Sequence, residues 1–447
     1  MTVPPATDYS LDFTPPPPVD PSIRRLLRPQ PVASAEEDEF RGHSKAIQRA
    51  QQIDQTRYAK LEADIGDTGY LPWILAAWED EKVLNSASVK HMTWEHWVRG
   101  CDYALAGTVP EVLNILAKRV NLAKTLRTDK PLASTLKDYG VGAAKEFPSI
   151  YVRQLVVGPD QDDITVEQAR DIALYIRQYA SAEPSKAEEA YIIDKKLRPD
   201  WTRELSEDGV RVLTHDKNGM PSAYKKSVLQ TFGENIEKAA DHAEALNHTH
   251  IPTMYYVGYA HKAAERADQH AKKTLGTDAL FNLTEYLLEE WGHHPAAVMQ
   301  PVCLLLTHTY ADVAEMFLCR LSQGYYYAGG YNQAPCGNIS SVWAITKDQW
   351  AEFRMKHNTR FKYREKMEEE LVKRKAFQRR DFDAETDRLA TEIEKLEADE
   401  RKLIETHRKL ENELDIDHMK NDPFLSQFVA DWEKLDAFVK SSPLYHR

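Results

Sequence analysis

The sequence predicts a mostly helical α/β protein, and three observations lead to this fold class. Short runs rich in β-branched residues alternate with longer helical patterns between residues 147 and 323. Helical patterns with several tryptophans precede this region, and apolar residues in a 4-3 spacing follow it. The chain of 447 residues is 42% hydrophobic, which is enough apolar material for roughly two to four domains.

The composition of the chain excludes several classes of protein. A formal net charge of −12 argues against a protein that coats nucleic acid by bulk charge. No apolar run reaches the roughly 18 residues that a membrane-spanning helix needs, and no signal-peptide pattern opens the chain. The four cysteines are widely spread without a Cys-x-x-Cys pair, which points to a reducing compartment. We therefore expect an intracellular protein of the nucleus or cytoplasm, without membrane contact.

The first two segments of the chain differ sharply in composition. Residues 1–40 are rich in proline, with an unbroken run at Pro15–Pro18, and we expect them to form a disordered tail. Residues 41–145 carry amphipathic helical patterns and are predicted to form a helical domain. Its tryptophans are expected to pack in the core: Trp73, Trp78, Trp94 and Trp97.

Residues 146–245 begin an α/β segment. The run 149–157 is rich in β-branched residues and is followed by Gly-Pro-Asp, which predicts a strand and a turn. Thr165, followed three residues later by Gln168, predicts a capped helix that continues through Tyr179. Two more elements are predicted: a short strand at Gly209–Leu213 and a helix at Tyr224–Leu246.

Residues 246–345 form a compact alternation of strands and helices, which favours α/β organisation. The predicted elements, in order, are a strand at Pro252–Ala260, helices at Lys262–Lys273 and Asp278–Trp291, a buried strand at Val298–Thr307, a helix at Asp312–Gln323 and an aromatic, glycine-rich loop at Tyr325–Gly337.

A group of polar residues in this segment has the chemistry of a phosphodiester-cleaving site. Tyr256 and Gly258 lie in the predicted strand at 252–260, and Arg266 and His270 follow on the next helix. Residues four positions apart share one helix face, so both side chains are expected to point into one site. An arginine there can stabilise the charge that develops on a phosphate under attack.

Two later residues complete this candidate site. Glu315 is predicted on the helix at Asp312–Gln323, where a carboxylate beside a cationic pocket suits one hard divalent ion. Asn332 lies in the glycine-rich loop and is expected to hold the local geometry by bonding the backbone. The alternative for Glu315 is an ordinary surface carboxylate.

The order and spacing of these residues resemble the second half of the motif of the GIY-YIG nuclease superfamily, over about residues 250–340. That family includes homing endonucleases and the incision nuclease of nucleotide-excision repair. It folds as a small three-stranded antiparallel sheet flanked by helices. The matching residues are Tyr256, Gly258, Arg266, His270, Glu315 and Asn332.

The resemblance implies a role for each matching residue. Arg266 would hold and stabilise the scissile phosphate, and Glu315 would bind one Mg²⁺ or Mn²⁺ ion. Tyr256 would line the site, and His270 would assist near the attacking water. The residues that would support the structure are Gly258 and Asn332.

The family's first strand has the sequence Gly-Ile-Tyr, and its tyrosine is assigned to activating the water. No Gly-Ile-Tyr lies shortly before Tyr256 in this sequence. Ser149-Ile150-Tyr151 offers a tyrosine on a predicted strand about a hundred residues earlier. If Tyr151 is the counterpart, a large helical insertion separates two adjacent strands. Residues 246–345 are then the GIY-YIG-like domain, with a small antiparallel sheet, and residues 146–245 are its first half or an insertion in it.

Residues 346–447 are predicted to combine a basic helix with coiled-coil-like helices. Apolar residues recur in a 4-3 spacing from Leu389 to Leu414, and Glu400 and His407 occupy two of the core-type positions. Two outcomes stay open: a homodimer through these helices, or an intramolecular hairpin with the helix at Phe424–Val439.

The basic helix is a second feature that points to nucleic acid. Between residues 351 and 380 there are eleven lysines and arginines against five glutamates. A local excess of positive charge with interleaved aromatic residues suits a phosphate backbone, and the alternative is a solvated helix face. The residues expected to contact nucleic acid are Arg360, Lys362, Arg364, Lys373, Arg374 and Lys375.

Three hypotheses of function follow from these patterns. The first is a divalent-metal-dependent endonuclease that hydrolyses DNA phosphodiester bonds. The second is a catalytically degenerate nucleic-acid-binding protein that kept the fold and lost the chemistry. The third is a self-assembling structural protein, such as a shell component, whose proline-rich arm and terminal helices mediate assembly.

Overall fold

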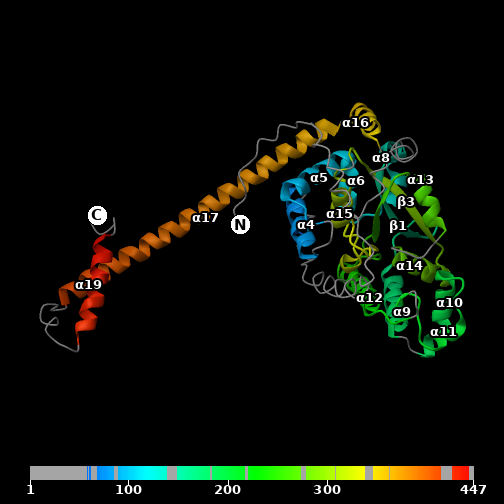
Figure 1. Ribbon diagram of the computed structural model, residues 1–447, viewed down its shortest axis with the longest axis horizontal. Coiled ribbons are helices and arrows are strands. Elements are labelled where there is room, and N and C mark those ends of the chain that lie inside the picture. The colour runs from blue at the N-terminus through cyan, green and yellow to red at the C-terminus, as the bar shows by residue number, and fades with distance from the viewer. Residues whose placement is uncertain are drawn as a thin grey trace, which may run out of the picture.

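The computed structural model describes residues 58, 60–61, 68–84, 89–137, 148–181, 184–216, 220–272, 278–307, 309–337, 346–361, 363–413 and 425–441. These residues form a mostly helical α/β fold with one small antiparallel sheet, as the sequence predicts. Figure 1 shows a compact body that contains the sheet and a long helix that projects away from it. The proline-rich tail expected at residues 1–40 lies outside the described residues.

The sheet has three antiparallel strands in the order β2-β1-β3. Its strands are β1 (Ser149–Val157), β2 (Tyr255–Ala260) and β3 (Pro295–Leu304). Strand β1 is buried along nearly its whole length, which suits the central strand of the sheet, and its β-branched and apolar residues fit that position. The first strand of the α/β segment therefore lies between two strands that follow it about a hundred residues or more later.

The chain between β1 and β2 is a helical insertion. It contains α9 (Val166–Ser181), η2 (Pro184–Lys186), α10 (Ala187–Leu197), α11 (Arg203–Glu207) and α12 (Ala223–Ala245). Helices α9 and α12 pack along each other below the sheet (Figure 1). The predicted cap of α9 is present: the Thr165 Oγ1 accepts from the Gln168 N–H at 3.2 Å, and the Gln168 Oε1 accepts from the Thr165 N–H at 2.9 Å.

The short strand predicted at Gly209–Leu213 is wrong, because this stretch forms turns. The Val212 N–H donates to the Asp194 carboxylate at 3.1 Å, and the Leu213 N–H donates to the Tyr179 hydroxyl at 3.2 Å. Side chains of α9 and α10 thus accept hydrogen bonds from backbone N–H groups that a neighbouring strand would otherwise satisfy.

The tryptophan-rich helices share one continuous apolar core with the sheet. Trp73 and Trp97 are fully buried in it, and the core extends from Tyr58 to Met367. The helices of this part are α4 (Leu71–Leu84), α5 (Trp94–Gly107), α6 (Pro110–Ala117), α7 (Leu122–Thr128) and α8 (Lys130–Lys137).

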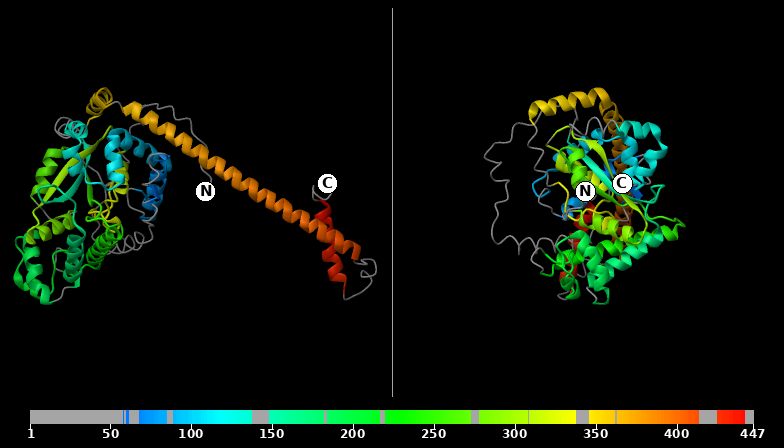
Figure 2. Two further views of the ribbon diagram at one scale, coloured as in Figure 1. Left: turned by 180° about the vertical axis from the view of Figure 1, so that it is seen from behind. Right: turned by 90° about the vertical axis from the view of Figure 1, so that its right-hand side faces the viewer.

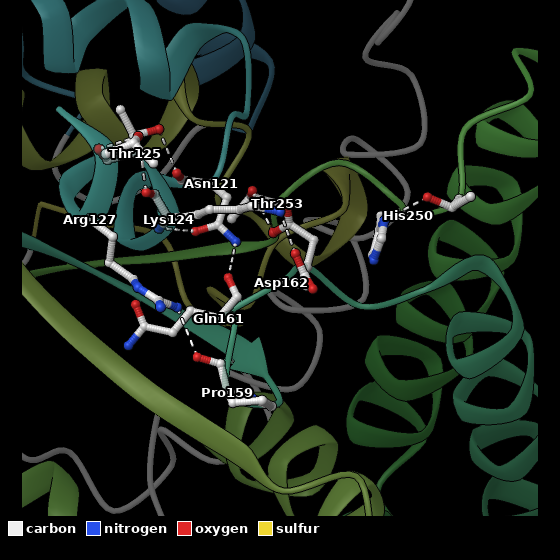
Figure 3. Close-up of polar contacts among 12 residues, drawn as sticks. Asn121, Lys124, Thr125, Arg127, Pro159, Gln161, Asp162, His250 and Thr253 are labelled. Carbon is white, nitrogen blue, oxygen red and sulfur yellow. Dashed lines mark hydrogen bonds and ion pairs between the residues drawn. The ribbon is translucent and has the colours of Figure 1, made fainter.

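Polar contacts fasten the short helix α7 to the loop after β1 (Figure 3). The Asn121 Nδ2 donates to the Gln161 carbonyl at 2.9 Å, and Lys124 forms an ion pair with Asp162. The Arg127 Nη1 donates to the Pro159 carbonyl at 2.8 Å. Because these groups mostly satisfy loop carbonyls and a helix end, we interpret the cluster as structural.

After β2 the elements match the predicted order, with ends shifted by a few residues. They are α13 (Ala263–Ala271), α14 (Ala279–Glu290), β3, α15 (Ala311–Leu321) and η3 (Tyr326–Ala328). Helix α15 packs against α5 and against β2, so the N-terminal helices and the sheet bury a common face.

The C-terminal part consists of α16 (Lys347–Phe361), α17 (Tyr363–Glu413) and α19 (Ser426–Ser441). Helix α17 leaves the body, and α19 lies against its far end (Figure 2). The His407 ring stacks on the Trp432 ring with centroids 4.7 Å apart. This contact between α17 and α19 of one chain forms the predicted intramolecular hairpin. The homodimer stays a prediction. Leu414 and Phe424 lie outside the described residues. Among the described helices, none has the length and apolar character needed to span a bilayer.

Candidate active site

One face of the sheet carries the aromatic and charged residues of the candidate site. Tyr151 on β1 pairs with Gly258 on β2, and Arg153 pairs with Tyr256. Alternate residues of a strand share a face, so Tyr151, Arg153 and Tyr256 lie on the same side of the sheet. The Tyr151 and Tyr256 rings stack with centroids 6.3 Å apart.

Gly258 makes room for the Tyr151 side chain. A Cβ atom at this position would lie 2.5 Å from the Tyr151 hydroxyl oxygen and 2.7 Å from its ring. Contacts that close are not tolerated, so the phenol lies across β2 only because residue 258 has no side chain.

Helix α13 brings two predicted residues to this tyrosine. The Arg266 Nε donates to the Tyr151 hydroxyl at 3.2 Å, and the His270 Nε2 lies 2.7 Å from the same oxygen. The His270 ring also meets the Tyr256 ring edge-on at 5.9 Å. The helix spacing of four residues therefore places both side chains on the Tyr151 hydroxyl, which comes from a strand more than a hundred residues earlier.

Two further residues, which sequence reasoning missed, complete the cluster. Arg153 is 2% exposed, and its Nη1 donates to the Asp278 Oδ2 at 2.8 Å. The same Asp278 oxygen contacts the His270 Nδ1. Arg153 is a charged residue in a mostly apolar predicted strand, and Asp278 immediately precedes an apolar helix; both were weak signals that could have been used.

Burial and charge set the protonation of these groups. Burial raises the pKa of Tyr151 to about 12, although the neighbouring Arg266 guanidinium lowers it. Burial also lowers the pKa of His270, against the opposing effect of Asp278. At neutral pH the site therefore holds a neutral phenol and a neutral imidazole beside the guanidinium of Arg266.

Asn332 pairs with the backbone of β2. Its Oδ1 accepts from the Val257 N–H at 2.8 Å, and its Nδ2 donates to the Val257 carbonyl at 2.6 Å. Strand β2 lies at the edge of the sheet, so the Asn332 amide completes hydrogen bonds that a further strand would otherwise make. This contact holds the glycine-rich loop against the strand that carries Tyr256.

Glu315 lies half-buried on α15, next to the end of β2. Its Oε2 accepts from the Gly337 N–H at 2.7 Å. Burial raises the pKa of Glu315 to about 7, while backbone N–H groups of Gly337 and Tyr259 and the charge of Arg266 lower it. The electrostatic effect of Arg266 links this carboxylate to the Tyr151 cluster.

The donors around Glu315 are compatible with one divalent ion but not with a protein-built cage. In the part of the chain that the structure describes, no three or more His, Cys, Asp or Glu side chains gather as a ligand set. Asp312, one turn earlier on α15, raises the pKa of Glu315 by its charge. A cation held by one carboxylate, water and substrate oxygens is the arrangement that Mg²⁺ often adopts, and it would favour the ionised form of Glu315.

The predicted nucleic-acid residues divide into three groups. Arg374 is buried, and it forms ion pairs with Asp102 at 2.5 Å and with Glu370 at 3.1 Å. Its guanidinium is therefore engaged within the fold, which corrects its expected role as a phosphate contact. Lys373 and Lys375 are exposed on α17. The side chains outside the described set are those of Arg360, Lys362 and Arg364.

Comparison of the chain with protein-family models, curated proteins and solved structures finds no match. The chemistry of the site is therefore inferred from its own residues. They provide a tyrosine hydroxyl between a guanidinium and an imidazole, and a half-buried carboxylate within reach of the same guanidinium's charge.

Proposed function

We propose that this protein is a divalent-metal-dependent endonuclease that hydrolyses DNA phosphodiester bonds. The observation that carries the proposal is the placement of the Tyr151 hydroxyl between the Arg266 Nε and the His270 Nε2. A water held beside this hydroxyl would meet a proton acceptor and a cation together, which is what in-line attack on a phosphate requires. The GIY-YIG resemblance supports the same chemistry.

Arg266 would bind the scissile phosphate. Its Nε donates to Tyr151 and its Nη1 donates to the Gln269 Oε1 at 2.9 Å, so part of its planar fork still faces outward. A guanidinium bonded in this way is held in one orientation before substrate binds. Its charge would then stabilise the additional negative charge of the transition state.

Glu315 would hold the metal ion. Bound there, Mg²⁺ or Mn²⁺ would neutralise charge on the phosphate and the leaving oxygen. The two backbone N–H groups that reach the carboxylate fix its position relative to β2. A DNA substrate implies that the protein acts where it can reach DNA, in the nucleus or the cytoplasm. The exposed Lys373 and Lys375 on α17 would offer further contacts to DNA phosphates.

Plasmid cleavage tests this proposal. The purified protein is expected to nick or cut plasmid DNA with Mg²⁺ or Mn²⁺, and a chelator should stop the reaction. Glu315→Gln should abolish cleavage, and Arg266→Ala should slow it by about 100-fold or more. Glu265→Gln, which changes an exposed carboxylate on α13, is the matched control and should cleave like the wild type.

Two results would refute the proposal in different ways. DNA binding without cleavage in either metal would favour the degenerate nucleic-acid-binding protein. Large particles in solution without DNA binding would favour the self-assembling shell protein.

Tyr151→Phe with full activity would remove Tyr151 as the residue that activates water.

A further inference from the structure

Four side chains form a continuous chain of contacts that begins at the Tyr151 hydroxyl, beside which the attacking water would lie. The Tyr151 hydroxyl lies 2.7 Å from the His270 Nε2, and the His270 Nδ1 contacts the Asp278 Oδ2. The Arg153 Nη1 donates to the same Asp278 oxygen at 2.8 Å. Arg153 is also fixed from its other side, because its guanidinium lies 4.0 Å from the centre of the Phe281 ring.

The contacts decide which imidazole nitrogen carries the proton. The His270 Nδ1 lies 2.9 Å from the Arg153 Nη1, but it lies closer to the Asp278 carboxylate oxygen. An unprotonated Nδ1 would face that carboxylate with its lone pair and be repelled. A proton on Nδ1 makes this contact a charge-assisted hydrogen bond. The Nε2 lone pair is then directed at the Tyr151 hydroxyl.

We propose that Asp278 and Arg153 are positioning residues that hold His270 as the acceptor of the Tyr151 proton. This inference rests on the proposed hydrolysis. Asp278 fixes the tautomer and orientation of His270 and stabilises the imidazolium that forms. Arg153 pairs with Asp278 and opposes the rise that this carboxylate causes in the pKa of His270, so that the imidazole stays neutral before substrate arrives.

The step balances in protons and bonds. As the water oxygen forms a bond to phosphorus, one water proton passes to the Tyr151 oxygen and the Tyr151 proton passes to the His270 Nε2. The bond from phosphorus to the leaving oxygen breaks, and that oxygen takes a proton from solvent. The imidazolium then returns its extra proton to solvent, so that Tyr151 and His270 end as they began.

Charged and titratable groups face His270 from several elements. Tyr151 and Arg153 face it from β1, Tyr256 faces it from β2, and Arg266 precedes it by one turn on α13. Asp278 approaches from the start of α14. Burial, Arg153 and Arg266 lower the pKa of His270, and Asp278 raises it. The two positioning residues therefore act on this pKa in opposite directions.

Nitrogen NMR of the imidazole tests the inference without substrate. The His270 signal is identified by its loss in His270→Gln. In the wild type we expect a proton on Nδ1 and a hydrogen-bonded Nε2 without one. Asp278→Asn should lower the pKa of His270, Arg153→Gln should raise it, and Arg153→Lys should leave it nearly unchanged.

The pH dependence of cleavage supplies the second measurement. Asp278→Asn should lower kcat by about 100-fold or more with KM little changed, and it should move the acid limb of the profile to lower pH. Arg153→Gln should move that limb to higher pH. Asp268→Asn, an exposed carboxylate on α13, is the matched control. If the ion pair between Asp278 and Arg153 were purely structural, the two substitutions would change stability. They would not move the acid limb to lower pH in one variant and to higher pH in the other.

The outcomes separate this inference from the proposed function. A proton on Nε2, or a His270 pKa that neither substitution moves, overturns the relay even if the wild type cleaves DNA. A wild type that never cleaves overturns the proposed function, and the tautomer measurement still decides whether Asp278 and Arg153 set the proton position. If Arg153→Gln fails to fold, Asp278→Asn and Arg153→Lys still provide the comparison.

Discussion

At the scale of single residues, Gly258 and Glu315 show how small local features control the candidate site. Gly258 leaves space for the Tyr151 phenol, which the register of β1 and β2 places directly opposite. Glu315 carries a carboxyl group whose burial raises its pKa to about 7. Each residue acts through its immediate surroundings, so a single substitution is expected to have a specific effect.

Gly258→Ala should displace the Tyr151 ring, because the new Cβ atom would lie 2.5 Å from the tyrosine oxygen. We expect a loss of about 1–3 kcal/mol in unfolding free energy and a strong loss of cleavage. Adding Tyr151→Phe removes the oxygen that clashes, so the double variant should recover part of the stability but not the activity. Additive losses in denaturant unfolding would contradict this contact.

Glu315→Gln should change how stability depends on pH. The folded-state pKa of about 7 lies above the ordinary value of 4.5, so the folded protein binds more protons between these pH values. Without divalent cations, the stability of the wild type relative to Glu315→Gln should fall as pH rises from about 4.5 to 7. Mg²⁺ or Mn²⁺ at pH 7 should stabilise the wild type alone. Parallel profiles in denaturant unfolding would contradict both expectations.

At the scale of elements, the start of α17 is fastened to the body by a buried ion cluster. Arg374 pairs with Asp102 of α5 and with Glu370, and the Glu370 Oε1 accepts from the Tyr70 N–H at 2.8 Å. The basic run in the sequence therefore contains one residue that fixes the exit of α17 instead of facing solvent. Its exposed neighbours Lys373 and Lys375 remain candidates for phosphate contacts.

Arg374→Met should destabilise the protein because it leaves the buried Glu370 and the mostly buried Asp102 without their cation. Breaking such a pair costs about 3–5 kcal/mol, whereas an exposed substitution usually changes stability by less than about 0.5 kcal/mol. Lys373→Met on the same helix is the matched control. Denaturant unfolding of both variants checks the difference, and equal losses would contradict the anchoring role of Arg374.

At the scale of the whole molecule, one apolar core contains the N-terminal helices and the sheet, and the far part of α17 lies outside it. The core extends from Tyr58 to Met367, while most described side chains of α17 beyond residue 388 are exposed. Figure 2 shows this part of α17 projecting away from the body. The body should therefore unfold as one cooperative unit, and the α17–α19 hairpin should open more readily.

Hydrogen exchange should show this difference directly. Backbone amides of β1 are expected to exchange slowest, and those of α19 and of residues 388–413 much faster, because few buried apolar contacts protect them. Equal protection at high protein concentration, lost on dilution, would instead indicate that these helices bury a surface against a second copy. That result would favour the homodimer over the hairpin.

The sequence by itself determined those features that depend on neighbours along the chain. Thr165 and Gln168 marked the start of α9, and the spacing of Arg266 and His270 placed both on one face of α13. Caps, turns and periodicity are local, so they can be identified from the residues within a few positions. The same locality explains why the order of the later elements was predicted with only small shifts at their ends.

The tertiary structure alone decided which distant segments meet. Strand β1 became the central strand, and Tyr151 met His270 across 119 residues of sequence. The pair Arg153–Asp278 spans 125 residues, and Arg374 is buried against Asp102 of a helix far upstream. Such pairings depend on the packing of the whole core, because the entropy of closing a long loop must be offset by contacts that no local pattern contains.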